Sequence, residues 1–168
     1  GRVRPDSVFV AELDGQMRAE AKSGRVALGV PLLLRLSRAT EGYNPFANED
    51  EIGFEASGFG MTRVLIVTDR GVASIGVPQR ISDGLKRYNI ESDIFADVHI
   101  EPTDQSISSA VDYARQEGPW DGFIVVGGGS AIDTAKAINL LTSYPGELMD
   151  YINKPVGKAK VPPGPLKP

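Results

Sequence analysis

An apolar run that ends in three consecutive glycines and continues into a helical pattern constrains this chain more than any other feature. Residues 121–126 form the apolar run, residues 127–129 are all glycine, and residues 131–138 repeat small and apolar side chains at helical spacing. Backbone without Cβ atoms can come within hydrogen-bonding distance of a bulky anion. The start of the following helix offers unpaired N–H groups and the positive end of its dipole, so the pattern predicts a phosphate or pyrophosphate site.

The glycine loop matches neither of the common nucleotide motifs. In G-x-G-x-x-G register Ile132 stands at the third glycine, and G-x-x-x-x-G-K-[ST] is absent. A tight turn from strand to helix that binds nothing therefore remains an alternative. Ser130 either caps the helix or donates to a phosphate oxygen, whereas Asp133 either faces a ligand on the loop or only complements the helix dipole.

Strand-like and helical segments alternate after about residue 51. Strands are expected at residues 63–68, 94–96 and 121–126, with helices after Gly76, after the N-cap Thr103 and after the glycine loop. This alternation predicts an α/β fold with a parallel sheet covered by helices on both faces. Ligands of such sheets bind at the carboxyl ends of the strands. Asp69, at one such end, either accepts ribose hydroxyls and repels a 2′-phosphate or is an ordinary turn acid.

Three segments are expected along the chain. Residues 1–49 are interrupted by Gly and Pro and are predicted to be an extension, with a thin helix at 7–22 and a loop at 40–50. Residues 50–152 carry the regular pattern and form the predicted domain. Residues 153–168 contain five prolines and are expected to form an extended connector.

Composition excludes several classes of protein. The 168 residues carry 18 Lys and Arg against 22 Asp and Glu, a net charge of −4, which argues against a nucleic-acid partner. There is no cysteine, and the only histidine is His99, so thiolate chemistry and a His-rich metal site cannot come from these residues. No run reaches the roughly 18 apolar residues of a membrane span, so we expect a soluble, intracellular protein without a membrane partner.

Four segments together resemble the iron-containing (group III) alcohol dehydrogenase family. They are residues 64–71, Gly76-Val77, residues 101–104 and residues 127–137, in the order and spacing of that family. Within it the chain is most similar to the hydroxyacid-oxoacid transhydrogenase branch, through residues 98–104, Asp150-Tyr151 and residues 155–160 leading into 165–168. The resemblance implies that residues 50–168 represent the family's Rossmann-like NAD-binding domain.

The resemblance also implies roles for particular residues. Asp69 would meet the adenosine ribose, Asp133 would lie near the nicotinamide, and Glu101 stands where the family commonly has asparagine. The full implied cofactor-binding set is Asp69, Glu101, Pro102, Thr103, Gly127, Gly128, Gly129, Ser130 and Asp133.

The implied activity is hydride transfer between a 4-hydroxybutyrate-like alcohol and 2-oxoglutarate through NAD. In the family a divalent metal, iron or zinc, is held by one Asp and three His of a C-terminal helical domain that is expected to be absent here, so this chain alone would bind only nucleotide.

The alternatives are a non-catalytic α/β domain that binds a partner, and a phosphoanion-binding protein that uses only the glycine loop. The expected partners are the nucleotide and a second copy in a homo-oligomer, and the expected location is cytoplasmic, or mitochondrial in a eukaryote.

Overall fold

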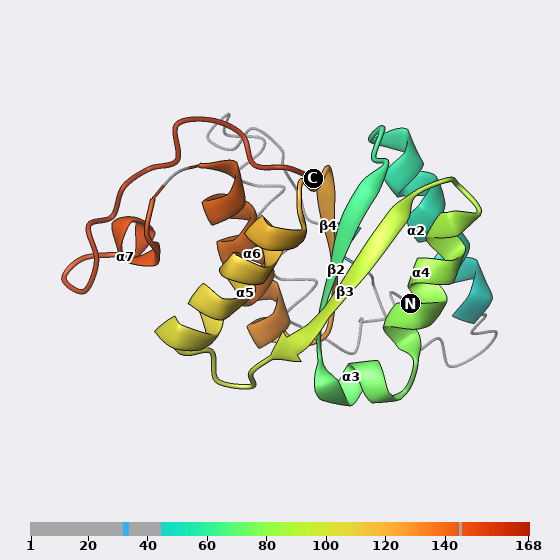
Figure 1. Ribbon diagram of the computed structural model, residues 1–168, viewed down its shortest axis with the longest axis horizontal. Coiled ribbons are helices and arrows are strands. Elements are labelled where there is room, and N and C mark those ends of the chain that lie inside the picture. Colours follow the sequence, from blue (N-terminus) through green and yellow to red (C-terminus); the bar gives the residue numbers. More distant parts are fainter. Residues whose placement is uncertain (1–31, 34–44, 145) are drawn as a thin grey trace, which may run out of the picture.

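A parallel sheet forms the centre of the molecule (Figure 1). The computed structural model describes residues 32–33, 45–144 and 146–168. All strand pairs are parallel, and their order in the sheet is β1-β4-β2-β3. The strands are β1 (Leu32–Leu33), β2 (Arg63–Asp69), β3 (Glu91–Val98) and β4 (Gly122–Val126). The predicted α/β class is confirmed, and so are the three predicted strands, of which β3 is longer than expected.

Helices cover both faces of the sheet, as predicted (Figure 1). One face carries α2 (Pro45–Gly58) and α4 (Val77–Lys86), and the other carries α5 (Asp104–Glu117) and α6 (Gly129–Ser143). Successive β2 side chains alternate between the two, since Val64 and Ile66 pack in one apolar cluster and Leu65 and Val67 in the other. All four are fully buried, which explains why the strand is apolar throughout rather than alternating.

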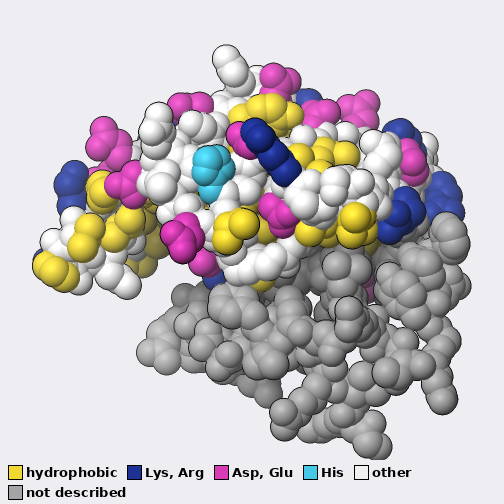
Figure 2. Space-filling model, turned by 90° about the horizontal axis from the view of Figure 1, so that it is seen from below, with side chains coloured by type: hydrophobic (Ala, Val, Ile, Leu, Met, Phe, Trp, Pro, Cys, Tyr) yellow, Lys and Arg dark blue, Asp and Glu magenta, His cyan; other side chains and the backbone are white. Residues whose placement is uncertain are grey.

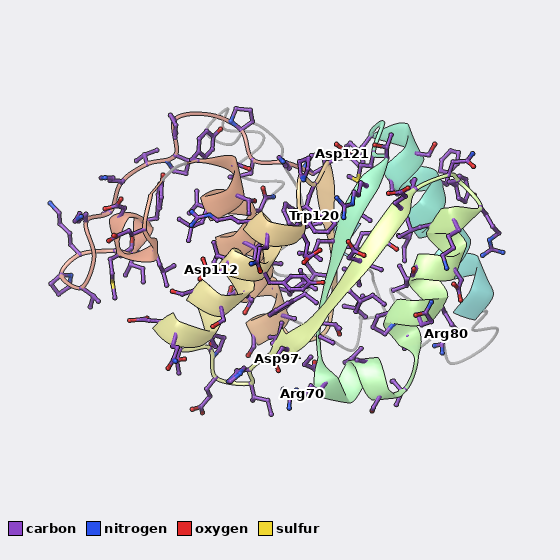
Figure 3. All side chains as sticks on the ribbon, viewed as in Figure 1. Arg70, Arg80, Asp97, Asp112, Trp120 and Asp121 are labelled. Atoms are coloured by element: carbon purple, nitrogen blue, oxygen red, sulfur yellow. The ribbon has the colours of Figure 1, made fainter. Side chains whose placement is uncertain are left out.

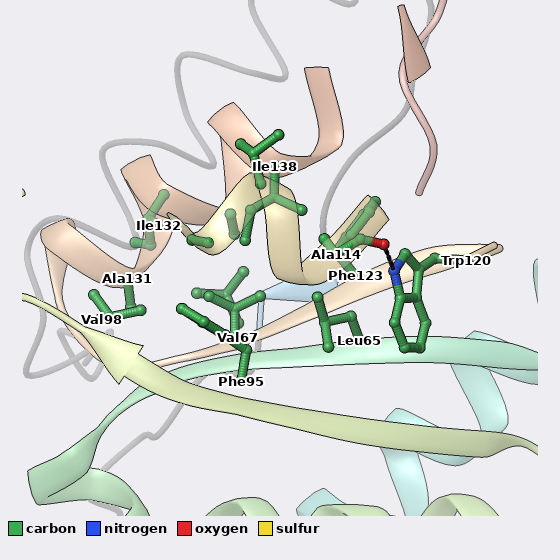
Figure 4. Packing of buried hydrophobic residues seen from close by; sticks show 14 of the residues in the cluster. Leu65, Val67, Phe95, Val98, Ala114, Trp120, Phe123, Ala131, Ile132 and Ile138 are labelled. Atoms are coloured by element: carbon green, nitrogen blue, oxygen red, sulfur yellow. Dashed lines mark hydrogen bonds between the residues drawn. The ribbon is translucent and has the colours of Figure 1, made fainter. Parts of the chain in front are cut away.

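The cluster beneath α5 and α6 has a large aromatic component (Figure 4). Phe123 of β4 is fully buried there, a burial worth about 1.5–3 kcal/mol for a side chain of this size. Trp120 is also buried, and its indole N–H donates to the Ala114 carbonyl at 2.7 Å. Tyr113 packs against Phe95 at a ring distance of 5.2 Å. These aromatic residues therefore hold α5 against the sheet.

Local signals set the starts of the helices that the sequence predicted. Gly76 precedes α4 with a φ of 77°, a conformation that favours glycine, and Pro78 lies in the first turn. Thr103 caps α5, and its hydroxyl accepts from the Ser106 amide at 3.1 Å while the Ser106 hydroxyl accepts from the Thr103 amide at 2.8 Å. The predicted N-cap at Thr103 is confirmed.

The loop predicted at residues 40–50 is wrong at residues 45–50, which belong to α2. The helix crosses the predicted boundary between residues 49 and 50. Its buried positions Ile52 and Ala56 are four residues apart and pack in the cluster that includes α4. Two such positions are too few to reveal a helical period in the sequence. The helix predicted at residues 7–22 lies outside the described residues.

Residues 153–168 contain no helix or strand, yet their end is attached to the sheet. The buried Asn139 side chain donates to the Lys167 carbonyl at 2.7 Å and accepts from the Lys167 amide at 3.1 Å. The Phe123 amide of β4 donates to the Pro168 carbonyl at 2.9 Å. The short helix α7 (Leu148–Tyr151) precedes this segment. Among the described residues, no helix combines the length and the apolarity needed to cross a membrane.

Candidate nucleotide-binding site

The carboxyl ends of β2, β3 and β4 meet along one edge of the sheet, the lower edge in Figure 1. Asp69 is the register partner of Val98 at the end of β3, and Thr68 is the partner of Val126 at the end of β4. Asp69 is the last residue of β2, and the segments that follow β3 and β4 carry residues 99–103 and the glycine loop. The expectation that Asp69 and the glycine loop lie on the same edge is therefore confirmed.

The glycine loop combines a restricted position with an open one. Gly127 has a φ of 152°, and a Cβ there would lie 3.0 Å from Ala131 Cβ and 3.3 Å from Asp69 Oδ2. Gly128 is exposed, and a Cβ on it would have no other atom within 4 Å. Gly127 thus lets the loop approach α6 and Asp69, while Gly128 faces open space.

The first turn of α6 leaves donors beside that space. Gly128 is the N-cap of the helix, and its carbonyl accepts from the Ala131 amide at 3.1 Å and from the Ile132 amide at 3.2 Å. The amides of Gly129 and Ser130, as the first two of the helix, have no partner within it. Ala131 and Ala135 are buried, so the helix packs closely on the sheet as expected from their size. The arrangement fits the demands of a pyrophosphate.

Ser130 does not cap the helix, so that alternative from the sequence is wrong. The N-cap Gly128 has no side-chain hydrogen bond, and the Ser130 hydroxyl donates instead to the carbonyl of Ile100. This bond joins the start of α6 to the loop between β3 and α5. The parallel strands bring the loop that contains Ile100 next to the start of α6, so the Ser130 hydroxyl donates to the Ile100 carbonyl. The local sequence does not reveal this contact.

The turn-acid alternative for Asp69 is confirmed, and one of its carboxylate oxygens is left for other contacts. Its Oδ1 accepts from the Val72 amide at 2.9 Å and caps the short helix α3 (Arg70–Ser74), which the sequence did not predict. Its Oδ2 is the oxygen near Gly127. The cap therefore orients the carboxylate, and the second oxygen lies beside the glycine loop as an acceptor.

The remaining predicted residues follow the same edge. Glu101 is exposed, Pro102 is half-buried, and the Thr103 side chain is engaged in capping α5. Asp133 is exposed on α6, and its Oδ1 lies 3.6 Å from Lys136 Nζ. The structure brings Asp69 next to Gly127, and the Ser130 hydroxyl next to the Ile100 carbonyl. For Glu101 and Asp133 it provides an exposed position near this edge.

Sequence reasoning missed an ion pair at this edge. Arg70 Nη2 lies 2.6 Å from Asp97 Oδ1 (Figure 3). Seen from below, the face around this edge shows basic, acidic and hydrophobic side chains close together (Figure 2). Arg70 directly follows Asp69 in the sequence, but the pair depends on β3 extending to Val98 beside β2, which was not predicted.

The described residues offer no cluster of metal ligands, and one pocket lies away from the glycine loop. Among the described residues, no group of three or more His, Cys, Asp or Glu side chains could hold a metal ion, so these residues do not fit the metal that the resemblance implies. A pocket of about 420 Å³ is lined by residues of α5, the end of α6 and residues 146–149. None of the nine predicted cofactor-binding residues lines this pocket.

Comparison with known proteins gives consistent matches. The family model described as iron-containing alcohol dehydrogenase matches residues 47–168. The mitochondrial hydroxyacid-oxoacid transhydrogenase of Xenopus tropicalis is 39% identical over 119 residues, which cover 70% of this chain and 26% of that protein. The chain therefore spans about a quarter of the length of the curated relatives it matches.

Solved structures share the fold. A 1,3-propanediol oxidoreductase is 25% identical with a TM-score of 0.59, and the match covers 79% of this chain and 33% of that one. An NADH-dependent butanol dehydrogenase A from Thermotoga maritima is 28% identical with a TM-score of 0.57, and the match covers 74% of this chain and 29% of that one.

Proposed function

The chain belongs to the iron-containing alcohol dehydrogenase family, and on that premise we propose that residues 50–152 are the cofactor-binding half of an NAD-dependent oxidoreductase. The proposed reaction is hydride transfer between a 4-hydroxybutyrate-like alcohol and 2-oxoglutarate. The similarity to hydroxyacid-oxoacid transhydrogenases supports this substrate class. The NADH-dependent relative of known structure supports NAD as the cofactor. By itself the chain is proposed to bind the nucleotide.

One observation carries the proposal. The Asp69 carboxylate oxygen that is not used for capping lies beside Gly127, and Gly128 next to it faces open space. An acceptor for ribose hydroxyls and a bare backbone for phosphates thus occur together, as a dinucleotide requires. A turn that bound nothing would not need both.

Each element of the site has a task in this proposal. The amides of Gly129 and Ser130 donate to the pyrophosphate, and the dipole of α6 favours its negative charge. Asp69 accepts from the ribose hydroxyls, and residues Glu101, Pro102 and Thr103 line the adenine side. Asp133 lies toward the nicotinamide. When bound, NAD supplies the hydride acceptor, and these residues orient it.

No step of the reaction is assigned to a metal, because the described residues do not fit one. For the location we propose the cytoplasm, or the mitochondrion if the source is a eukaryote. The similar transhydrogenases carry the description mitochondrial. A homo-oligomer is proposed as the assembled form.

Calorimetric titration with NAD tests the binding function. We expect micromolar or tighter binding by the unaltered chain, and its loss in Gly128→Val. The substitution fills the open space, while the backbone of Gly128, with a φ of −88° and a ψ of −167°, suits valine without strain. Unchanged thermal unfolding of the variant would verify that the loss is local.

A second variant separates dinucleotide binding from the alternatives. Asp69→Asn keeps a side-chain oxygen that caps α3 but removes the negative charge that strengthens the hydrogen bonds from the ribose hydroxyls. We therefore expect NAD affinity to fall at least fivefold. Equal affinity in this variant would favour a phosphoanion-binding protein that uses only the glycine loop. No binding by the unaltered chain at millimolar NAD would favour a non-catalytic domain.

A further inference from the structure

The ion pair at the site edge connects the start of α3 to β3 beside the proposed ribose position. Arg70 is the residue after Asp69, and Asp97 lies on β3, the neighbour of β2. Their charged atoms are 2.6 Å apart, with 83% of the Arg70 side chain and 53% of the Asp97 side chain exposed (Figure 3). The pair is therefore open to a ligand that reaches this edge.

The chemistry of this corner bears on which dinucleotide can bind. A ribose whose hydroxyls meet Asp69 would place its 2′-oxygen beside residues 69 and 70. A 2′-phosphate there is repelled by the Asp69 carboxylate, and an arginine near this position is the group that accommodates such a phosphate. Arg70 has the right chemistry and place in the chain, but its guanidinium is held by Asp97.

We infer that Asp97 is a positioning residue for cofactor choice: by holding Arg70 in the ion pair, it withholds the cation that a 2′-phosphate needs and so favours NAD over NADP. This inference rests on the proposed function, because it assigns a preference to the same site. Asp69 opposes the 2′-phosphate directly, and Asp97 opposes it through Arg70. Since exposed ion pairs are weak, the contribution of Asp97 is expected to be severalfold rather than large.

The test is the ratio of NADP affinity to NAD affinity, measured by calorimetry at low ionic strength. The starting variant is Asp69→Asn, which relieves the direct repulsion and keeps an oxygen for the cap. Adding Asp97→Asn is expected to raise the ratio three- to fivefold, because the freed Arg70 can bind the phosphate. Adding Arg70→Gln to the double variant is expected to abolish that gain.

Asp93→Asn is the matched control, since it removes one negative charge from the same strand. Asp93 lies toward the opposite end of the β2–β3 pair, where its Oδ2 is 2.9 Å from Arg63 Nη2. The Asp93→Asn substitution is therefore expected to leave the ratio of NADP affinity to NAD affinity unchanged. The inference is overturned if Asp97→Asn moves the ratio no more than Asp93→Asn does, or if its gain survives Arg70→Gln. If NAD binding is normal while the ratio does not move, only this inference fails; if the unaltered chain does not bind NAD, the proposed function fails with it.

Discussion

Asp150, near the end of α7, is the most strongly perturbed carboxylate among the described residues. Its side chain is only 10% exposed and lies 2.8 Å from Lys158 Nζ and 3.1 Å from Lys160 Nζ. Hydrogen bonds from Lys158 and Lys160, and one from the Glu147 amide, hold its pKa far below the ordinary value of an aspartate. In turn, Asp150 raises the pKa of Lys158. The contact ties the Pro-rich end of the chain to α7.

The lowered pKa of Asp150 predicts a pH dependence of stability. A carboxylate whose pKa is lower in the folded state contributes fully above its unfolded pKa of about 4, and the contribution is lost as the pH falls below that value. Asp150→Asn should therefore lower the melting temperature at pH 7, and its difference from the unaltered chain should shrink as the solution is acidified. Thermal unfolding followed by circular dichroism between neutral and acidic pH measures this.

Asp112→Asn is the control for Asp150, because it removes an exposed carboxylate from α5. A pH-independent difference for Asp150→Asn would contradict the lysine contacts. The raised pKa of Lys158 gives the opposite sign at the alkaline end: its contribution is present below the unfolded lysine pKa and is lost as the pH rises through the higher folded value.

At the scale of elements, α5 begins where the sequence predicted and for the predicted reason. Thr103→Ala removes the hydroxyl that accepts from the Ser106 amide, and should lower the free energy of unfolding by about 1 kcal/mol. Ser109→Ala in the same helix should change it by less than about 0.5 kcal/mol, because a mid-helix serine bonded to the carbonyl four residues earlier adds little. Urea denaturation measures both; an equal loss in the two variants would argue against the cap.

The helix α2 is the longest element that sequence reasoning missed, and the reason is physical. Its apolar face toward the sheet is short, and Phe54 on the same helix is 66% exposed, which blurs any helical period. Its helical form depends on packing against α4, an element about 30 residues further along. Where packing rather than local propensity holds a helix, the local sequence carries a weak signal.

At the scale of the whole molecule, two large apolar side chains lie exposed near the edge that carries the candidate site. Ile75 follows α3 and is 67% exposed, and Ile100 precedes α5 and is 88% exposed. Large apolar side chains that are exposed to water gain free energy when a second surface covers them. This edge is therefore the contact surface that we propose for a homo-oligomer.

We expect the chain to self-associate at high concentration and the double substitution Ile75→Ser, Ile100→Ser to shift it toward the monomer. Light scattering over a concentration series measures the change. Val156→Ser, Val161→Ser is the control, because both valines are more than 70% exposed but lie in the segment after α7. A chain that stays monomeric at the highest concentration would contradict the prediction, and an equal effect of the control pair would place the contact elsewhere.

The parts of this protein that local chemistry controls could be predicted from its sequence. These parts act through their own backbone or their near neighbours in the chain. They are the apolar strands, Gly76 and Thr103 at helix starts, and the glycines at residues 127–129. The α/β class follows because alternating strands and helices of this length have few ways to bury their apolar faces. The edge shared by Asp69 and the glycine loop follows from the parallel arrangement.

Which side chains meet across that edge depends on how the strands and loops are arranged in three dimensions. Asp69 reaches Gly127, 58 residues further along; the Ser130 hydroxyl bonds to Ile100, and Arg70 pairs with Asp97. Each contact depends on the register between strands and on the segment that leaves a strand end. Register is set by the packing of the whole sheet, so a local reading of the chain does not contain it.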